Sequence, residues 1–239
     1  MTSTGTYVYS PSAANIVTNA FAMIQVRRPE ITTGHLLDAA EQANMLMVDI
    51  SNRNPNRWLM ETQTQVLSAT STYTLAARTL AIALTTVTTT SGGQTLDRVI
   101  GPISATEYAA MPNKSQSGPP TSYFFNLQTT PTITVWPVPD AATIAALGTL
   151  TMTTFRQVQD VDLTNGASLD APYRFLDAIT TGLAARLAEI YPDAILKSKG
   201  PQAIDRLLSM YEQRVTLAKS RDQERVNLFI QPALGSYFR

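Results

Sequence analysis

His35 and Asp38 are the first residues whose types and spacing could do chemistry. Asp38 follows the chain's one histidine by three positions on a predicted helix, so its carboxylate could orient the imidazole ring. No serine or cysteine nucleophile motif accompanies these two residues, and covalent catalysis of this kind needs one. We therefore interpret them as a polar pair at the start of a surface helix.

Two further groups of carboxylates could serve a site. Asp160 and Asp162, in the segment QDVDLTNG, could supply oxygen ligands to a hard cation. Their spacing departs from that of calcium-binding loops and the late glutamate is missing, so we favour a solvated loop. Glu61, Glu107 and Glu189 are of the type used in glycoside hydrolysis, but nothing in their spacing brings two of them together.

Motifs typical of enzymes are missing from the rest of the sequence. It contains no glycine-rich phosphate-binding pattern and no G-x-S-x-G nucleophile motif. It contains no cysteine, which excludes disulfides and thiolate metal sites, and a single histidine argues against zinc. The sequence predicts a protein that is not an enzyme, with no catalytic residue, no metal site and no cofactor.

Composition favours a subunit of a larger assembly. Charged residues make up 15% of the chain, whereas globular proteins average about 25%. So neutral a surface is best covered by other copies of the chain, which predicts a homo-oligomer. The formal net charge of zero argues against tight, sequence-independent binding of nucleic acid. No secretory signal is expected at the N-terminus, and no apolar stretch is long enough to span a membrane.

The middle of the chain is typical of β structure. Residues 62–155 carry only six charged residues and are rich in Thr, Val, Ile, Leu and Pro, and residues 115–139 carry no charge. One helical turn or two is expected at Ala105–Met111. The predicted strands are Trp58–Leu67, Tyr73–Leu75, Leu80–Thr90, Arg98–Ile103, Tyr123–Leu127, Thr132–Trp136 and Gly148–Val158.

The two ends of the chain are typical of helices, because apolar residues recur there at helical spacing. Helices are predicted from Ser12 to before Pro29, over Thr33–Arg53, over Ser168–Tyr191 with Pro172 in the first turn, and over Pro201–Asn227. The predicted apolar stripes are Ile16, Val17, Ala20, Phe21 and Ile24; Leu36, Leu37, Ala40, Ala43, Met47 and Ile50; Phe175, Leu176, Ile179, Leu183, Leu187 and Ile190; and Ile204, Leu207, Leu208, Tyr211, Val215 and Ala218.

These elements predict an α+β fold. Helices with one apolar stripe cannot bury that stripe alone, so the N- and C-terminal helices should pack as one discontinuous bundle, residues 1–57 plus 165–227. Residues 58–164 then form an inserted small antiparallel β-sandwich or barrel. Residues 228–239 form an extended C-terminal arm.

The C-terminal arm is apolar and aromatic around the helix-breaking Pro232 and Gly235. We interpret it as a segment that docks on a partner and becomes ordered there; the alternative is that it folds back on its own domain. The predicted docking residues are Phe229, Ile230, Leu234, Tyr237 and Phe238.

The last predicted helix with its flanks, Lys197–Arg225, carries seven basic and four acidic residues. One interpretation is a mildly basic surface that faces DNA phosphates. An ordinary solvated helix with ion pairs one turn apart is the favoured alternative.

A series of short motifs adds a resemblance. Ala20–Ile24 ends the first helix in an A-x-x-x-I pattern, an acidic-to-apolar second helix follows over Leu36–Ile50, and Trp58 then enters the strands. Later come Pro120–Tyr123 (P-x-x-Y) and a strand that ends in W-P-x-P. The last two motifs are Trp136–Pro139 and Leu187–Tyr191 (L-A-x-x-Y). In this order and spacing, over about residues 12–225, they resemble the head-to-tail adaptor proteins of short-tailed bacteriophages, also called tail tubular protein A-like or tail accessory proteins.

The resemblance implies a structural protein of the virion at the head–tail junction, assembled in the host cytoplasm. Such adaptors form rings, commonly dodecameric, under the portal protein, extend the DNA channel and offer a platform for the tail nozzle or tail tube. A C-terminal extension often reaches into the portal, a role suited to residues 228–239. The wall of the channel then contacts double-stranded DNA transiently, and the candidate lining residues are Arg214, Lys219, Arg221 and Arg225.

Two alternatives stay open at the level of the sequence. One is a virion-associated cell-wall hydrolase, which needs a pair of carboxylates in one cleft. The other is a soluble β-sandwich binding module that recognises a glycan or peptide and exists as a monomer.

Overall fold

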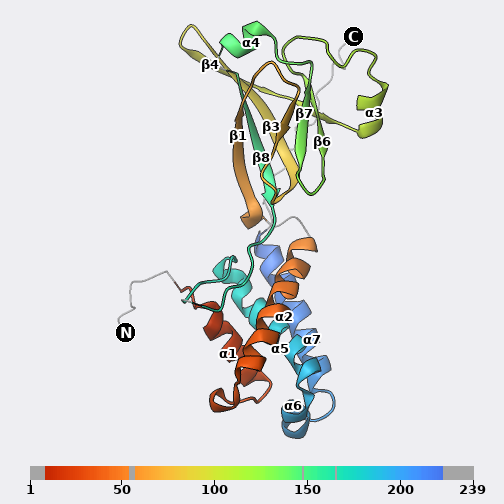
Figure 1. Ribbon diagram of the computed structural model, residues 1–239. Helices are drawn as coiled ribbons and strands as arrows, with labels where there is room; N and C mark the ends of the chain where they lie inside the picture. Colours follow the sequence, from red (N-terminus) through yellow and green to blue (C-terminus); the bar gives the residue numbers. More distant parts are fainter. Residues whose placement is uncertain (1–8, 54–56, 147, 165, 223–239) are drawn as a thin grey trace, which may run out of the picture.

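A computed structural model describes residues 9–53, 57–146, 148–164 and 166–222. The fold is α+β: a helical bundle lies at one end of the molecule and two β-sheets lie at the other (Figure 1). The first two long helices precede the sheets in the chain and the last three follow them. Helices α1 (Ala13–Met23), α2 (Thr33–Asn52), α5 (Leu176–Ile190), α6 (Pro192–Lys199) and α7 (Ala203–Asp222) form the bundle, with 3₁₀ turns at Arg28–Glu30, Arg57–Leu59 and Tyr173–Phe175.

Helices α1 and α2 begin where their capping residues require. Ser12 Oγ accepts a hydrogen bond from Asn15 N at 3.3 Å, and Thr32 Oγ1 accepts one from His35 N at 3.4 Å. The predicted stripe of α1 is buried as expected. In α2 the prediction was partly wrong: Leu36 and Leu37 are 39% and 69% exposed. They lie in the first turns of α2, outside its buried face, which is formed by Ala39, Ala43, Leu46, Met47 and Ile50.

Helix α5 is the centre of the bundle, and α1, α2 and α7 all pack against it. Most of its side chains are therefore buried, on more than one face. Gly182 allows the closest approach: a Cβ atom there would lie 2.7 Å from the ring of Tyr211 and 2.9 Å from Leu46. The closeness of α7 to α5 thus depends on the missing side chain at this position.

Two details of the C-terminal helices differ from the prediction. The helix expected from Ser168 begins only at Leu176, after a 3₁₀ turn, because Pro172 is extended with ψ at 154°. Pro192 does not simply follow a helix but opens α6 at its first position, where proline is tolerated. Gly200 ends α6 with a positive φ of 84°. Ile190 and Leu208, predicted to be buried, are 42% and 38% exposed.

The inserted segment forms two four-stranded sheets. One has the order β1-β8-β3-β4 and is antiparallel throughout; the other has the order β2-β7-β6-β5. Side chains from both sheets form a second hydrophobic core that includes Tyr73, Val87, Ile133 and Leu150, so the arrangement is a sandwich. The strands are β1 (Met60–Val66), β2 (Thr72–Thr74), β3 (Thr79–Ser91), β4 (Gln94–Val99), β5 (Gly101–Ile103), β6 (Ser122–Asn126), β7 (Thr132–Trp136) and β8 (Thr149–Arg156).

The sandwich differs from the prediction at three places. The strand expected over Arg98–Ile103 is divided, because buried Ile100 carries the chain from β4 in one sheet to β5 in the other. Strand β5 pairs with β6 in parallel, so that sheet is mixed rather than antiparallel. The expected short helix is α3 (Ala105–Ala110), but α4 (Ala141–Ala145), capped by Asp140, was not predicted.

The core of the bundle is the larger of the two hydrophobic cores. It contains Phe21, Met47, Phe175, Leu183 and Leu187, all at most 1% exposed. It also takes in Leu59 and Val158, which lie just outside the two ends of the strand region. The sandwich is therefore tied to the bundle by apolar contacts at both crossings of the chain.

Gly182→Ala should destabilise the bundle by about 1–3 kcal/mol, the usual cost of an extra atom in a packed core. The higher helix propensity of alanine offsets only part of this, because the added Cβ meets the Tyr211 ring. Urea unfolding followed by far-UV circular dichroism measures the change. Gly34→Ala is the matched control: its Cβ would have its nearest neighbour at 3.7 Å, so it should be neutral or stabilising. Equal stability of the two variants would contradict the role given to Gly182.

Candidate functional site

The structure does not bring His35 and Asp38 together as a catalytic pair. His35 Nδ1 accepts a hydrogen bond from the backbone N–H of Thr32 at 3.0 Å, which completes the cap of α2. Its ring lies edge-on to Tyr191, with ring centroids 4.6 Å apart. Asp38 instead accepts a hydrogen bond from the Tyr191 hydroxyl, and that bond raises the pKa of Tyr191 to about 12. His35 therefore caps the start of α2 and packs its ring against Tyr191.

Three of the other candidate carboxylates, Asp162, Glu61 and Glu107, are also engaged locally. Asp162 Oδ1 accepts bonds from the backbone N–H and the hydroxyl of Thr164, at 2.8 and 2.6 Å, which lower the pKa of Asp162 and close a turn. Glu61 binds Arg78, and Glu107 caps α3 by accepting from Ser104 N at 2.7 Å. Within the described ranges, no three His, Asp or Glu side chains gather as a metal site would require. None of these residues forms a reactive constellation with another.

Three of the basic residues predicted to face DNA lie among the described residues, and their surroundings differ. Arg214 forms an ion pair with Asp177 of α5 at 2.8 Å. Lys219 is half-buried on the side of α7 that faces α2, and desolvation together with the charge of Arg53 lowers its pKa. Arg221 is exposed. Arg225 lies outside the described residues, as do the predicted docking residues Phe229, Ile230, Leu234, Tyr237 and Phe238.

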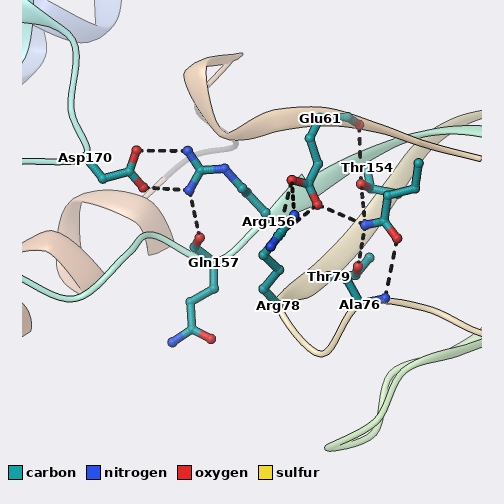
Figure 2. A network of polar contacts seen from close by, with 9 residues as sticks. Glu61, Ala76, Arg78, Thr79, Thr154, Arg156, Gln157 and Asp170 are labelled. Atoms are coloured by element: carbon teal, nitrogen blue, oxygen red, sulfur yellow. Dashed lines mark hydrogen bonds and ion pairs between the residues drawn. The ribbon is translucent and has the colours of Figure 1, made fainter.

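A network of polar contacts holds the place where the chain returns from the sandwich to the bundle (Figure 2). Arg156, the last residue of β8, forms a two-pronged ion pair with Asp170, with N–O distances of 2.6 and 2.8 Å. Gln159 N donates to the same carboxylate at 3.0 Å. Both charged side chains are less than one-fifth exposed, so this pair is shielded from solvent far better than a surface pair.

A second set of contacts holds the outward crossing from α2 to β1. Asp222, at the end of α7, accepts a hydrogen bond from Arg57 N at 3.0 Å and forms an ion pair with Arg174. Trp58 packs on Phe175 with ring centroids 6.1 Å apart. The return crossing is therefore held by Asp170, in the segment that leads into α5, and the outward crossing is held by Asp222, at the end of α7. The sandwich is thus attached to the bundle at two points.

Beside this junction, the side chains of Glu61 and Gln63, both in β1, lie at the edge of the sandwich. Gln63 Nε2 lies within 3.1 Å of Glu61, Thr79 and Thr154, and its Oε1 accepts from Ala76 N. The carboxylate of Glu61 is bound by Arg78, whose side chain is 60% exposed (Figure 2). These contacts satisfy polar groups that would otherwise lie unpaired at the edge of the second core.

The outer face of the sheet β1-β8-β3-β4 is almost without charge. The alternation of buried and exposed residues and the strand register place mainly threonines on this face. Asp97 is the one charged residue among the described strand positions of the face, and Thr88 donates to it at 2.6 Å. Met60, Val66, Leu84 and Val99 are 37–68% exposed here. The threonines are Thr62, Thr64, Thr86, Thr88, Thr90, Thr95, Thr149, Thr151 and Thr153.

Sequence reasoning missed the junction and part of this face. Arg156 and Asp170 are 14 residues apart and belong to no periodic pattern, so no local signal announces them. The threonine face did leave a signal: Thr149, Thr151 and Thr153 alternate with Leu150 and Met152, the period of a half-buried strand. Such alternation predicts which residues point outward, but not that four strands align them on one surface.

The comparisons with known proteins give one positive result. A family model described as SU10 adaptor protein matches residues 13–231, which is most of the chain. No curated protein matches the sequence. This result confirms the resemblance to phage head-to-tail adaptors drawn from the motifs. Among the described residues, no helix is long and apolar enough to cross a membrane.

Asp170→Asn should lower the free energy of unfolding by about 1–3 kcal/mol at pH 7, since it removes the charged acceptor of Arg156. Burial raises the pKa of Asp170, but hydrogen bonds from Arg156 and Gln159 N and the Arg156 charge outweigh it, so the net pKa is below its usual 3.8. A carboxyl with a depressed pKa stabilises the fold above its usual pKa and loses this as the pH falls through the folded-state value.

The measurement is urea unfolding of both proteins from pH 7 down to pH 2. The gap between the wild type and Asp170→Asn should be full at pH 7 and narrow only below pH 4. Arg78→Met is the control for an exposed ion-pair partner and should cost at most about 1 kcal/mol. A gap that stayed constant to low pH would show that the Asp170 charge does not hold the junction.

Proposed function

This chain belongs to the SU10 adaptor protein family, a family of phage adaptors, and from that premise we propose that it is a structural, non-enzymatic component of the virion. In this proposal it forms a ring under the portal protein at the head–tail junction. The ring extends the DNA channel and offers the tail nozzle or tail tube a surface on which to dock. Assembly takes place in the host cytoplasm before the tail is added.

One observation carries the proposal: the family match extends over residues 13–231 and so includes both the bundle and the sandwich. A match to either part alone would leave the role of the other open. The geometry supports a mechanical role as well, because the shielded charges of the described residues sit in contacts that join elements, such as Arg156 with Asp170. We infer that each part of the chain has its own role in the assembly. The parts are the helical bundle (residues 1–57 plus 165–227), the sandwich (residues 58–164) and the arm.

The proposed partners are other copies of the chain, in a ring taken to be dodecameric, together with the portal and the tail. The uncharged threonine face of the sandwich supports contact with a protein surface rather than with DNA, because a phosphate backbone is held by clustered Lys and Arg. The bundle would stack against the portal, and the sandwich would face the tail or its neighbours in the ring.

Contact with double-stranded DNA in the channel is proposed to be transient. A duct wall that neutralised many phosphates would retain the genome, and the formal net charge of the chain is zero. Of the proposed lining residues, Arg214 is neutralised by Asp177 and Lys219 is half-buried. Arg221, exposed on α7, is the described residue best suited to a brief phosphate contact, with Arg225 as the next basic residue along the chain.

Residues 228–239 are proposed as the arm that docks on the portal. The arm is apolar, so it should gain binding energy by burying its aromatic side chains in a groove on the partner. Because the core of the bundle is formed by residues well before the arm, its removal should leave the fold intact.

Deletion of residues 228–239 should leave thermal unfolding unchanged and reduce joining to portal particles by at least tenfold, about 1.4 kcal/mol. Electron microscopy of purified protein mixed with portal particles measures both the ring and the joining. A full-length variant with serine at Phe229, Ile230, Leu234, Tyr237 and Phe238 separates the effect of side chains from that of length. Truncated protein that joins portals with unchanged affinity would contradict the role of the arm, and wild-type protein that never forms a ring would contradict the proposed function.

A further inference from the structure

The sheet β1-β8-β3-β4 ends in two open edges. Strands β1 and β4 each pair on one side only, with β8 and β3 respectively. All six residues of β4 are exposed, on both faces of the strand, so it extends past the cover of the second sheet. Neither strand contains lysine or proline, which commonly protect sheet edges, and no described residue pairs with their outer backbone groups.

We propose that β4 of one copy adds to the edge of β1 in the next copy, so that this sheet continues from subunit to subunit. The inference rests on the proposed ring and names the contact that builds it. The partner at each open edge is thus a second copy of this chain. Each copy uses its β4 to contact one neighbour and its β1 to contact the other.

The direction of the strands supports this contact. In a four-stranded sheet that is antiparallel throughout, the two edge strands run in opposite directions. A second copy placed beside the first in the same orientation therefore sets its β1 antiparallel to β4, which is the more stable pairing. The contact is heterologous, because it joins two different edges, and such contacts generate rings when the rotation closes.

Charge and burial select one register. Arg98 lies opposite buried Val87 and Glu61 lies opposite buried Thr154, so both side chains lie on the inward-facing side of the sheet, where Arg98 at the edge stays exposed. They can meet across an antiparallel β4–β1 contact, because directly opposite residues point to the same face. With Arg98 opposite Glu61, exposed Val99 lies opposite exposed Met60.

The remaining pairs of this register also match in character. The complete set is Val99 with Met60, Arg98 with Glu61, Asp97 with Thr62, Leu96 with Gln63, Thr95 with Thr64, and Gln94 with Gln65. A shift by two residues keeps the faces but separates Arg98 from Glu61 and Val99 from Met60. The strands are of similar length, six residues in β4 and seven in β1, so every position of β4 finds a partner.

The register also has the stagger that a closed assembly requires. Within one copy, Thr64, Thr151, Thr86 and Val99 lie on one line across the four strands. The proposed contact continues that line to Met60 of the next copy, four positions before Thr64. This is one residue per strand, the stagger at which barrel strands tilt by about 36°. Four strands per copy can therefore follow a tilted, closed path.

A contact between two β4 strands is the competing arrangement. It is isologous and produces pairs of molecules rather than rings. In one of its two central registers Asp97 would also lie opposite Asp97 of the other copy, which is unfavourable for like charges; in the other, Leu96 would lie opposite Leu96. The two arrangements predict different cross-links.

Cysteine cross-linking tests the proposal directly, because the chain contains no cysteine of its own. Full-length Thr64→Cys/Thr95→Cys places one thiol on each edge, on the outer face of the sheet. Within one copy the two positions are separated by three strand spacings, about 14 Å, too far for a disulfide. After mild oxidation of assembled protein, we expect a ladder of covalently linked multimers, and none from either single variant.

Thr62→Cys/Thr95→Cys is the matched control. Thr62 lies on the same face of β1 but two positions from the proposed partner, so its cross-linking should fall at least fivefold. The presence of rings is checked by electron microscopy on the same sample. Intact rings without a ladder would overturn the edge contact and leave the proposed function standing. Linked dimers from Asp97→Cys alone, whose thiols face each other when Asp97 lies opposite Asp97, would show the isologous contact instead, and protein that never assembles would contradict both proposals.

A charge variant gives an independent test. Arg98→Glu places like charges at the contact and should weaken assembly about fivefold, the equivalent of roughly 1 kcal/mol for a cross-strand pair. Asp97→Asn, one residue away on the other face, should assemble normally. Thermal unfolding of both variants shows whether the hydrogen bond from Arg98 to the Pro120 carbonyl matters for the fold of the single subunit. Normal assembly of a folded Arg98→Glu variant would contradict the proposed register.

Discussion

The packing of α7 on α5 is the constraint on which the rest of the molecule depends. The chain leaves the bundle after α2 and returns to it only after β8, so the sandwich is a long insertion whose two ends must be fixed. They are fixed because α1, α2 and α7 close around α5, and because Gly182 lets α7 come close enough to bring Asp222 to the outward crossing. Without the packing of these helices around α5, Asp170 and Asp222 would not be held in position to form their ion pairs at the junction.

The two crossings combine apolar and charged contacts, and each type has a separate effect. Leu59 and Val158 extend the core of the bundle toward the sandwich, which gives the junction its cohesion. The ion pair between Arg156 and Asp170 fixes the orientation of the crossing, since a two-pronged pair fixes the plane of the guanidinium as well as its position. Together these contacts hold the sandwich on the bundle at both crossings of the chain.

The sequence reveals those elements whose pattern is local. The stripe Ile16–Ile24 and part of the buried face of α2 (Ala43, Met47 and Ile50) could be predicted because helical spacing decides them, and the strands because β-branched residues alternate along them. The start of α5 was missed, since extended Pro172 delays it, and so was the parallel pairing of β5 with β6, which is a contact between distant segments. The junction was invisible for the same reason: Arg156 and Asp170 meet only after both cores have formed.

The charged side chains are distributed differently in the bundle and in the sandwich. In the bundle and at the junction, acidic side chains are held by neighbours: Asp38 by Tyr191, Asp222 by Arg174, Asp170 by Arg156. A hydrolase needs the opposite, a carboxylate whose proton can move in the presence of substrate. In the sandwich, charge is instead nearly removed from one whole face, and threonine hydroxyls and short apolar side chains replace it. Such a surface discriminates poorly by charge and can match another protein surface only by shape and hydroxyl hydrogen bonds, whereas backbone hydrogen bonds to another strand are available at the edges of the sheet. Specificity must then come from the few charges left at its edges, where Arg98 and Glu61 are found.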